Sequence, residues 1–239
     1  MCELQAQTLP KIVESTPLSI GKSVTIYSEV LEENRSLNIY FPENYSEKVH
    51  QSYPVIYLLD GSIDEDFLHI AGLVQFGSFS WINIVPESIV VGISNVDRKR
   101  DFTYPSQNAL DQQEFPSSGK SEMFIDFIEN ELQPFVRSEY RTANSSTLIG
   151  QSLGGLLATE ILFKRAELFD NYIIVSPSLW WDDERLLDYE LSMDYSEKAV
   201  YIAVGKEGEV MERTAVEFYS KLSTIAPDSI RLFFDLLED

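Results

Sequence analysis

The sequence predicts an α/β fold, in which a mostly parallel central sheet begins with an antiparallel hairpin and carries helices on both faces. Three observations support this prediction. Segments typical of strands come first, short apolar runs follow at intervals, and helical patterns lie between those runs. No repeat, low-complexity block or long linker divides the 239 residues. We therefore expect one domain over residues 1–239, with residues 1–20 as an N-terminal extension.

The predicted elements follow one another in a simple order. The hairpin comprises residues 22–31 and 35–45, where apolar and polar side chains alternate as in half-solvated strands. Six later segments are almost continuously apolar, which is typical of strands buried on both faces of a parallel sheet. These segments are 53–61, 87–94, 147–152, 171–178, 198–205 and 229–237. Helical periodicity is clearest in residues 122–136, 152–166 and 213–225.

The composition argues against several classes of function. The chain has 18 Lys and Arg against 39 Asp and Glu, and the resulting net charge of −21 disfavours nucleic-acid and anionic membrane partners. No run approaches the roughly 18 apolar residues of a membrane span, so we expect no membrane insertion. The only cysteine, Cys2, permits neither an internal disulfide nor a cysteine-based metal cluster. A cytoplasmic location and export to the periplasm after signal removal both stay open, as does the oligomeric state.

Residues 150–154 read Gly-Gln-Ser-Leu-Gly and match the pattern G-x-S-x-G. The match lies between a predicted strand and a predicted helix, which is the context of a nucleophilic serine on a sharp turn. At that helix N-terminus, free N–H groups and the helix dipole favour negative charge on Ser152. We expect the N–H of Leu153, with one from the loop around Gly61 and Ser62, to bind an oxyanion. The alternative is a helix N-cap serine in a glycine-rich turn.

Four blocks of the chain, taken in order, resemble the putative esterase family of α/β-hydrolases. They read YPVIYLLDG, SIVVGISNVDRKRDFTYP, TLIGQSLGGLLA and LFDNYIIVSPSLWWDD. The family includes esterase D and the siderophore esterases, and this chain is most similar to the enterobactin-esterase-like branch. The resemblance implies the α/β-hydrolase fold and hydrolysis of a small-molecule carboxylic ester through an acyl-serine, without a metal or organic cofactor.

The resemblance also implies site residues. Ser152 is the expected nucleophile, and Arg98 falls near an arginine that lines the active site of siderophore-esterase relatives, with Arg100 as the alternative register. Trp180 and Trp181 follow a predicted strand at the carboxyl edge of the sheet, where ligands of open α/β sheets bind. They are expected to flank an acyl or aromatic group. The alternative is core packing for one tryptophan and surface cover for the other.

The catalytic base and acid are harder to place. The family order is nucleophile, acid and then histidine, the last on a loop after the final strand. The final predicted strand ends two residues before Asp239, so we expect the histidine loop and the last helix to be missing from this chain and an apolar sheet face to be exposed. We interpret His69 as a partly buried structural residue, with general base as the less favoured alternative, and His50 as a surface residue. The acid candidates are Glu207 first and Glu209 second, unless the site works as a Ser-His dyad.

Three functions therefore remain as hypotheses. The first is a serine carboxylesterase of the siderophore-esterase type. The second is a non-catalytic ligand-binding relative that has lost the catalytic histidine, and the third is a thioesterase of the S-formylglutathione hydrolase type. The sequence has no P-loop, no dinucleotide fingerprint and no His/Cys ligand cluster, so neither a metal nor a nucleotide cofactor is expected.

Overall fold

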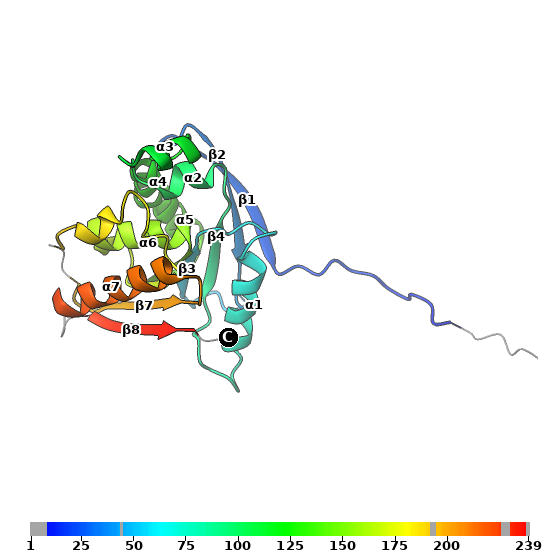
Figure 1. The fold of residues 1–239 in the computed structure, drawn as a ribbon. Coiled ribbons are helices and arrows are strands. Elements are labelled where there is room, and N and C mark those ends of the chain that lie inside the picture. Colours follow the sequence, from blue (N-terminus) through cyan, green and yellow to red (C-terminus); the bar gives the residue numbers. More distant parts are fainter. Residues whose placement is uncertain (1–8, 44, 192–194, 226–229, 238–239) are drawn as a thin grey trace, which may run out of the picture.

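The computed structural model describes residues 9–43, 45–191, 195–225 and 230–237. An eight-stranded sheet with the order β1-β2-β4-β3-β5-β6-β7-β8 forms its centre (Figure 1). The strands are β1 (Gly21–Ser28), β2 (Glu33–Tyr40), β3 (Tyr53–Leu58), β4 (Ile89–Ile93), β5 (Thr142–Gln151), β6 (Asn171–Val175), β7 (Lys198–Val204) and β8 (Ile230–Leu236). Cys2 lies outside the described residues.

Strand pairing confirms the predicted sheet. β2 pairs antiparallel with β1 and with β4, while the pairings that join β4, β3, β5, β6, β7 and β8 are parallel. β3 lies between β4 and β5, so the chain crosses over twice before it continues outward through β6 to β8. This is the α/β-hydrolase arrangement expected from the sequence. The carboxyl ends of β3, β5, β6 and β7 consequently meet at one edge of the sheet, which we call the carboxyl edge.

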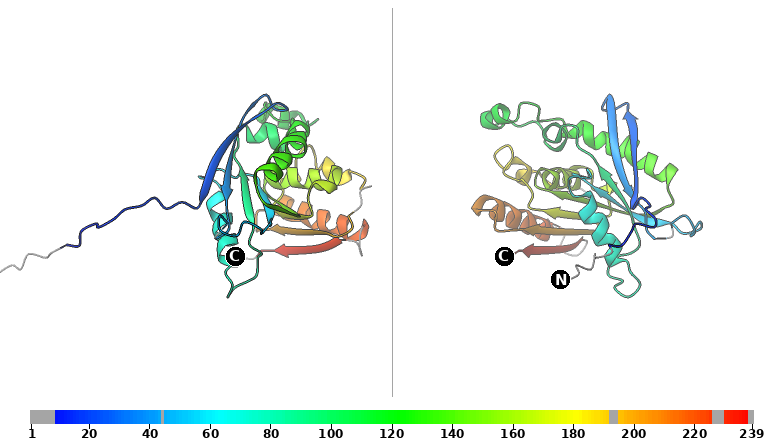
Figure 2. Two further views of the ribbon diagram at one scale, coloured as in Figure 1. Left: turned by 180° about the vertical axis from the view of Figure 1, so that it is seen from behind. Right: turned by 90° about the vertical axis from the view of Figure 1, so that its right-hand side faces the viewer.

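Helices cover both faces of the sheet (Figures 1 and 2). Helix α1 (Phe67–Gly77) lies on one face. On the opposite face lie α2 (Arg98–Phe102), α3 (Ala109–Glu114), α4 (Ser121–Phe127), the π-helical turn Ile128–Leu132, α5 (Gln133–Glu139), α6 (Leu153–Lys164) and α7 (Glu209–Ile225). The predicted helix over 122–136 is thus interrupted by a π-helical turn just before Pro134, a residue that cannot donate a backbone N–H. No helix among the described residues is long and apolar enough to span a membrane.

The core has two parts because neighbouring residues of a strand point to opposite faces. In β3, Tyr57 packs into the large cluster under α4 to α7, whereas Ile56 and Leu58 pack into a smaller cluster under α1. Burial on both faces explains why the sequences of the central strands are almost continuously apolar. At the β8 end of the sheet, Phe233 is 56% exposed.

Candidate active site

Ser152 occupies a strained turn between β5 and α6. β5 ends at Gln151 and α6 begins at Leu153, so the serine lies at the N-terminal end of the helix. Its φ of 55° and ψ of −118° belong to a region that L-residues rarely adopt, at a cost on the order of 1–3 kcal/mol. The half-buried side chain makes no capping hydrogen bond to the helix. Ser152 therefore differs from an ordinary N-cap serine, whose hydroxyl accepts from a nearby helical N–H.

The glycines around Ser152 allow α6 to pack directly against this turn. A Cβ on Gly150 would lie 2.3 Å from the carbonyl oxygen of Gly154, and a Cβ on Gly155 would lie 2.9 Å from Cα of Pro177. Both contacts involve backbone atoms, which cannot move aside as a flexible side chain can. Gly150 of the motif and Gly155 just after it are therefore required by the close approach of the strand, the turn and the helix.

The segment after β6 holds Ser152 in place. The Ser152 N–H donates to the carbonyl of Val175 at 3.0 Å, and the Ser152 carbonyl accepts from the N–H of Ser178, also at 3.0 Å. The hydroxyl oxygens of Ser152 and Ser178 lie 3.3 Å apart, and Ser178 is only 2% exposed. The sequence analysis did not identify Ser178. Its place in SPSLWW, at the carboxyl end of the strand beside β5, is the signal that could have found it.

The three expected oxyanion donors differ in their availability. Leu153 is the first residue of α6, so helix geometry provides no intrahelical acceptor for its N–H. By contrast, the Gly61 N–H donates to the carbonyl of Ile93 at 3.0 Å, and the Ser62 N–H donates to a carboxylate oxygen of Glu65 at 3.2 Å. The Leu153 N–H thus has no acceptor within the helix, whereas the N–H groups of Gly61 and Ser62 are both engaged within the chain.

Arg98 lies beside the Ser152 turn. Its Nε and Nη2 donate to the two carboxylate oxygens of Asp60 at 2.6 and 2.9 Å, and Nη2 also donates to the carbonyl of Gln151 at 3.2 Å. Burial opposes the positive charge, but the Asp60 carboxylate prevails and raises the pKa of Arg98. Asp60, the aspartate of LLDG, was given no role from the sequence. It follows β3 with a φ of 53°, and its carboxylate lies close to Gly154.

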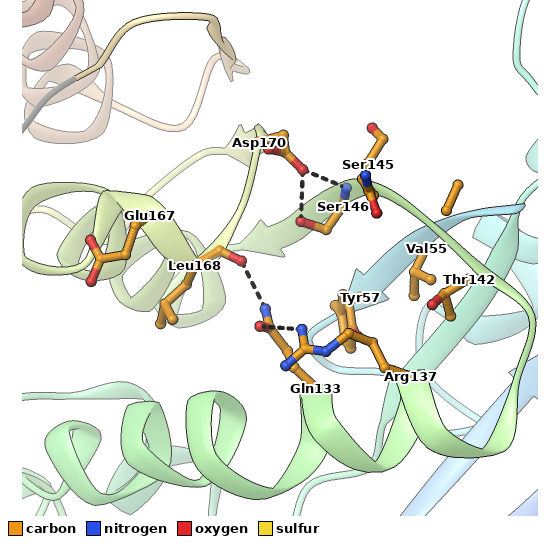
Figure 3. Close-up of a pocket in the computed structure, with 12 residues that line it drawn as sticks. Val55, Tyr57, Gln133, Arg137, Thr142, Ser145, Ser146, Glu167, Leu168 and Asp170 are labelled. Carbon is orange, nitrogen blue, oxygen red and sulfur yellow. Dashed lines mark hydrogen bonds between the residues drawn. The ribbon is translucent and has the colours of Figure 1, made fainter.

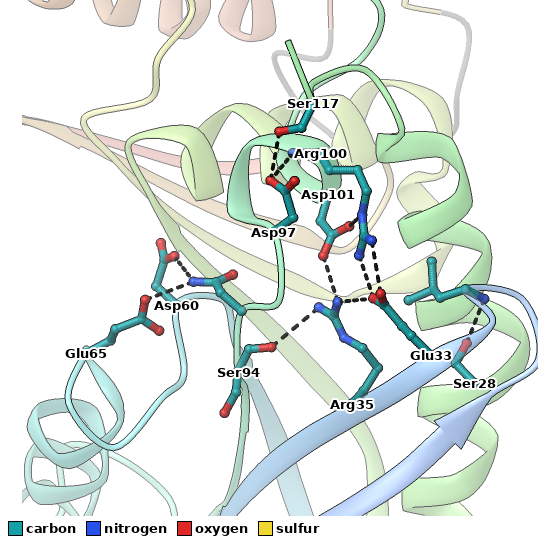
Figure 4. A network of polar contacts seen from close by, with 12 residues as sticks. Ser28, Glu33, Arg35, Asp60, Glu65, Ser94, Asp97, Arg100, Asp101 and Ser117 are labelled. Carbon is teal, nitrogen blue, oxygen red and sulfur yellow. Dashed lines mark hydrogen bonds and ion pairs between the residues drawn. The ribbon is translucent and has the colours of Figure 1, made fainter. Parts of the chain in front are cut away.

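Arg100 belongs to a different group of charges (Figure 4). Its guanidinium donates to Glu33 at 2.5 and 3.0 Å and to Asp101 at 2.7 Å. Arg35, which is fully buried, binds the same two carboxylates at 2.8 Å each. The hydrogen bond from Arg100 lowers the pKa of Glu33. We call these four residues, Glu33, Arg35, Arg100 and Asp101, the Arg35 network. Arg98 is also paired with a carboxylate, that of Asp60, but unlike Arg100 it contacts the Ser152 turn.

The two tryptophans have different environments. Trp181 is fully buried, and its indole N–H donates to the carbonyl of Tyr104 at 2.9 Å. Trp180 is half-buried, with its ring centre 6.3 Å from that of Phe115. The Lys99 ammonium in turn lies 4.7 Å from the centre of the Phe115 ring. Trp181 is a core residue, and Trp180 is the one with ring surface to offer a ligand.

The acid candidates lie after β7. Glu207 is exposed in the loop that follows the strand, and one of its carboxylate oxygens accepts a hydrogen bond from the buried hydroxyl of Ser176. Ser176 directly follows β6 and, like Ser152, has a positive φ, of 43°. Glu209 is the first residue of α7. The Ser176 hydrogen bond therefore fixes the Glu207 side chain at the carboxyl edge.

The prediction of a partly buried His69 is wrong. The residue lies on α1 but is exposed, because the buried face of this helix carries Phe67, Ala71 and Val74, and His69 points away from that face. His50 is exposed in a turn before β3, as expected. Within the described residues, neither histidine is hydrogen-bonded to Ser152. No group of three or more His, Cys, Asp or Glu in the described ranges could hold a metal ion.

A cavity of about 360 Å³ lies at the opposite edge of the sheet, near the amino ends of β3 and β5 (Figure 3). None of the predicted site residues lines it. β5 bulges here, because the pairing advances by two residues in β3 and by four in β5. The lining residues include Tyr57, Gln133, Arg137, Ser146 and Asp170.

Comparisons with known proteins place the chain among esterases. A family model described as Putative esterase matches residues 28–227. Ferri-bacillibactin esterase BesA of Bacillus subtilis (strain 168) is 29% identical over 225 residues, which cover 84% of this chain and 78% of that protein. An IroE-like serine hydrolase from Shewanella oneidensis has a TM-score of 0.81 at 30% identity, over 92% of this chain and 74% of that one. The BES protein from Bacillus cereus has a TM-score of 0.82 at 28% identity, over 98% of this chain and 92% of that one.

Proposed function

Because this chain belongs to the putative esterase family, we propose that it is a serine esterase that cleaves siderophore esters through an acyl intermediate on Ser152. One observation carries the proposal: Ser152 lies on a strained strand-to-helix turn at the N-terminus of α6, and its hydroxyl does not cap that helix. A strained conformation at such a position persists only where the surrounding structure enforces it. A serine oxygen held in this way is available to attack a carbonyl carbon.

The proposed reaction begins when Oγ of Ser152 attacks the ester carbonyl carbon. The carbonyl oxygen becomes an oxyanion, which accepts a hydrogen bond from the Leu153 N–H at the positive end of α6. We assign the second donor to Ser62, whose N–H changes its acceptor from Glu65 to the oxyanion. The C–O bond to the alcohol then breaks, the alcohol leaves with a proton, and water hydrolyses the acyl-serine. Gly61 contributes by its small size, because a Cβ there would lie 2.3 Å from Cα of Gly92.

The attack also requires a base that takes the hydroxyl proton of Ser152. We assign this role to neither His50 nor His69, since both are exposed and neither is hydrogen-bonded to Ser152 within the described residues. Glu207 is the carboxylate that we propose to orient the base, because the Ser176 hydroxyl holds it at the edge where Ser152 lies. Such a carboxylate fixes the tautomer of an imidazole and stabilises its charged form.

Arg98 beside the turn, together with Lys99 and the rings of Phe115 and Trp180, suits an anionic aromatic ester. Arg98 and Lys99 supply two cations on α2, and Trp180 and Phe115 supply ring surface beside Lys99. Aromatic rings pack against one another, and cations bind both carboxylate-like anions and ring faces. The relative from Bacillus subtilis is named as a ferri-bacillibactin esterase. A small-molecule siderophore with aryl groups and ester bonds combines these properties, so we propose this class as the substrate.

Fluorophosphonate labelling of the full-length protein tests the proposed nucleophile. We expect a covalent adduct that mass spectrometry places on the peptide containing Ser152. The variant Ser152→Ala should not label, while circular dichroism should show the same fold. An unlabelled wild-type protein, or an adduct on another serine, would contradict the proposal and would favour a non-catalytic ligand-binding relative.

Hydrolysis rates test the proposed substrate class. The probes are enterobactin, p-nitrophenyl acetate and the matched thioester, S-(p-nitrophenyl) thioacetate. We expect the highest kcat/KM for enterobactin, because all three substrates offer an aryl group to Trp180 but only enterobactin also offers acidic hydroxyl oxygens to Arg98. A preference for the thioester over both oxygen esters would instead support a thioesterase. Equal values for enterobactin and p-nitrophenyl acetate would contradict the siderophore assignment while leaving the esterase assignment intact.

A further inference from the structure

We propose that Ser178 is a positioning residue that orients the hydroxyl of Ser152 and donates a hydrogen bond to it. This inference rests on the proposed role of Ser152 as the nucleophile. It assigns a task to a buried serine that belongs neither to the G-x-S-x-G pattern nor to the expected acid and base.

The hydrogen-bonding capacity of Ser178 supports the direction of this bond. Ser178 is 2% exposed, and within the described residues its hydroxyl makes one hydrogen bond, the 3.3 Å contact with Oγ of Ser152. A buried hydroxyl is expected to use its proton in a hydrogen bond. If Ser178 donates, the proton of Ser152 stays available to a base. The distance exceeds the common value of about 2.8 Å, as is frequent for catalytic hydrogen bonds before substrate binds.

Ser178 is itself fixed by its surroundings. The N–H of Ser176 donates to the carbonyl of Ala203 in β7 at 2.7 Å, and the N–H of Trp181 donates to the carbonyl of Ser178 at 3.2 Å. Pro177, between the two serines, packs so tightly against Gly155 that no side chain fits there. Because the turn over residues 176–178 cannot shift away from Ser152, the two hydroxyl groups stay close together.

The consequence concerns the reactivity of Ser152 and leaves substrate binding unchanged. A serine side chain can rotate among three staggered positions, and a fixed partner favours one of them. As Oγ of Ser152 loses its proton and attacks, it gains negative charge, and a donated hydrogen bond to a charged oxygen is stronger than one to a neutral oxygen. Ser178 should therefore accelerate the covalent step and have no effect on the affinity for a reagent.

The kinetics of fluorophosphonate labelling at Ser152 test this inference. For Ser178→Ala we expect the maximal labelling rate to fall about tenfold, as for the loss of one hydrogen bond in a transition state, with an unchanged half-saturating concentration of the reagent. Ser178→Cys fills the same space with a much weaker donor, so we expect a similar fall. The matched control is Ser88→Ala, which removes another buried serine hydroxyl, 1% exposed as a residue and bonded to the Pro86 carbonyl, and should label like the wild type.

The possible outcomes separate this inference from the proposed function. Wild-type protein that does not label refutes the proposed nucleophile and, with it, the role of Ser178. Wild-type protein that labels, together with wild-type rates in Ser178→Ala and Ser178→Cys, refutes the role of Ser178 alone. A fall in the maximal labelling rate of Ser178→Ala but not of Ser178→Cys would show that the volume of the side chain matters and its hydrogen bond does not. This result would also overturn the inference. Melting temperatures identify any variant that fails to fold.

Discussion

Arg98 and Arg100 lie two residues apart on α2, yet they belong to two regions with opposite properties. Arg98 contacts Asp60 and the Ser152 turn, and a third of its side chain is exposed. Arg100 joins the Arg35 network, in which the side chains range from fully buried to 21% exposed. Both guanidinium groups of that network bind carboxylates, as Arg98 binds Asp60, but only Arg98 also donates to the Ser152 turn, at the carbonyl of Gln151.

The two regions also differ in their backbone. Beside Arg98, the residues that follow three neighbouring strands all have positive φ values: 53° for Asp60, 55° for Ser152 and 43° for Ser176. None of the four residues of the Arg35 network is among the described residues with positive φ. Strain combined with free hydrogen-bonding groups is expected at a site that acts on a ligand, whereas paired charges on relaxed backbone are expected to support the fold. Substitutions in the first region should change activity, and substitutions in the Arg35 network should change stability.

Removal of the Ser152 hydroxyl should give the largest effect. For Ser152→Ala and Ser152→Gly we expect kcat/KM for ester hydrolysis to fall by at least about a thousandfold, since the acyl-serine cannot form. The two variants should differ in stability. Glycine adopts positive φ without a steric penalty. We therefore expect the free energy of unfolding, measured in urea, to be about 1 kcal/mol higher for Ser152→Gly than for Ser152→Ala. Equal stabilities would argue against strain at this position.

Removal of the Arg98 guanidinium should give the next largest effect. For Arg98→Ala we expect KM for an anionic aryl ester to rise about tenfold with little change in kcat, since a cation that binds the substrate away from the reacting bond contributes to uniform binding. A neutral ester of the same alcohol serves as the control and should show a smaller change. A fall in kcat for both esters would place Arg98 at the reacting bond and contradict the assigned role.

The Arg35 network should respond in the opposite way. For Glu33→Gln we expect the free energy of unfolding to fall by about 1 kcal/mol at neutral pH and kcat/KM to stay unchanged, because the carboxylate accepts hydrogen bonds from Arg100 and Arg35. The Arg100 hydrogen bond lowers the pKa of Glu33 from 4.5 in the folded state. This contribution is therefore fully present above pH 4.5 and is lost as the pH falls through the lowered value.

Urea unfolding of wild type and Glu33→Gln at neutral pH and well below pH 4.5 checks this prediction. The stability difference between the two proteins should shrink in acid. A difference that is independent of pH would show that the carboxylate charge is not what stabilises the network. A loss of kcat/KM comparable to that of Arg98→Ala would remove the distinction between the two regions.

The sequence predicted the eight strands and the Ser152 turn because both depend on local patterns. Apolar runs identify strands buried on both faces, and G-x-S-x-G identifies a turn that only small residues permit. The turn over residues 176–178 could not be predicted in this way. The contact between Ser178 and Ser152 joins residues 26 positions apart, through strands that become neighbours only in the folded sheet.

The sequence also could not predict which residue of the basic run faces the site. Arg98 and Arg100 lie in one basic run, and composition does not say which of them points toward Asp60. The choice depends on the start of α2 after Asp97, whose side chain accepts a hydrogen bond from the Arg100 N–H and thereby fixes the direction of the helix. Likewise, the sequence left open whether both adjacent tryptophans face the ligand or one packs in the core; the structure buries Trp181, whose indole N–H donates to the Tyr104 carbonyl.

The smallest effect is expected from a substitution in the cavity near the amino ends of β3 and β5. It tests whether the position of Arg98 beside the Ser152 turn matters. Arg137 lines that cavity, and one of its nitrogens donates to Gln133 at 3.3 Å. Like Arg98 it is a cation that is at least partly exposed, but it lies at the edge remote from Ser152. For Arg137→Ala we expect kcat/KM for the anionic aryl ester to change less than about twofold, since a charge screened by solvent over that distance contributes little. A tenfold rise in KM would mean that any exposed cation in this acidic protein attracts the substrate, and that the position of Arg98 has no special meaning.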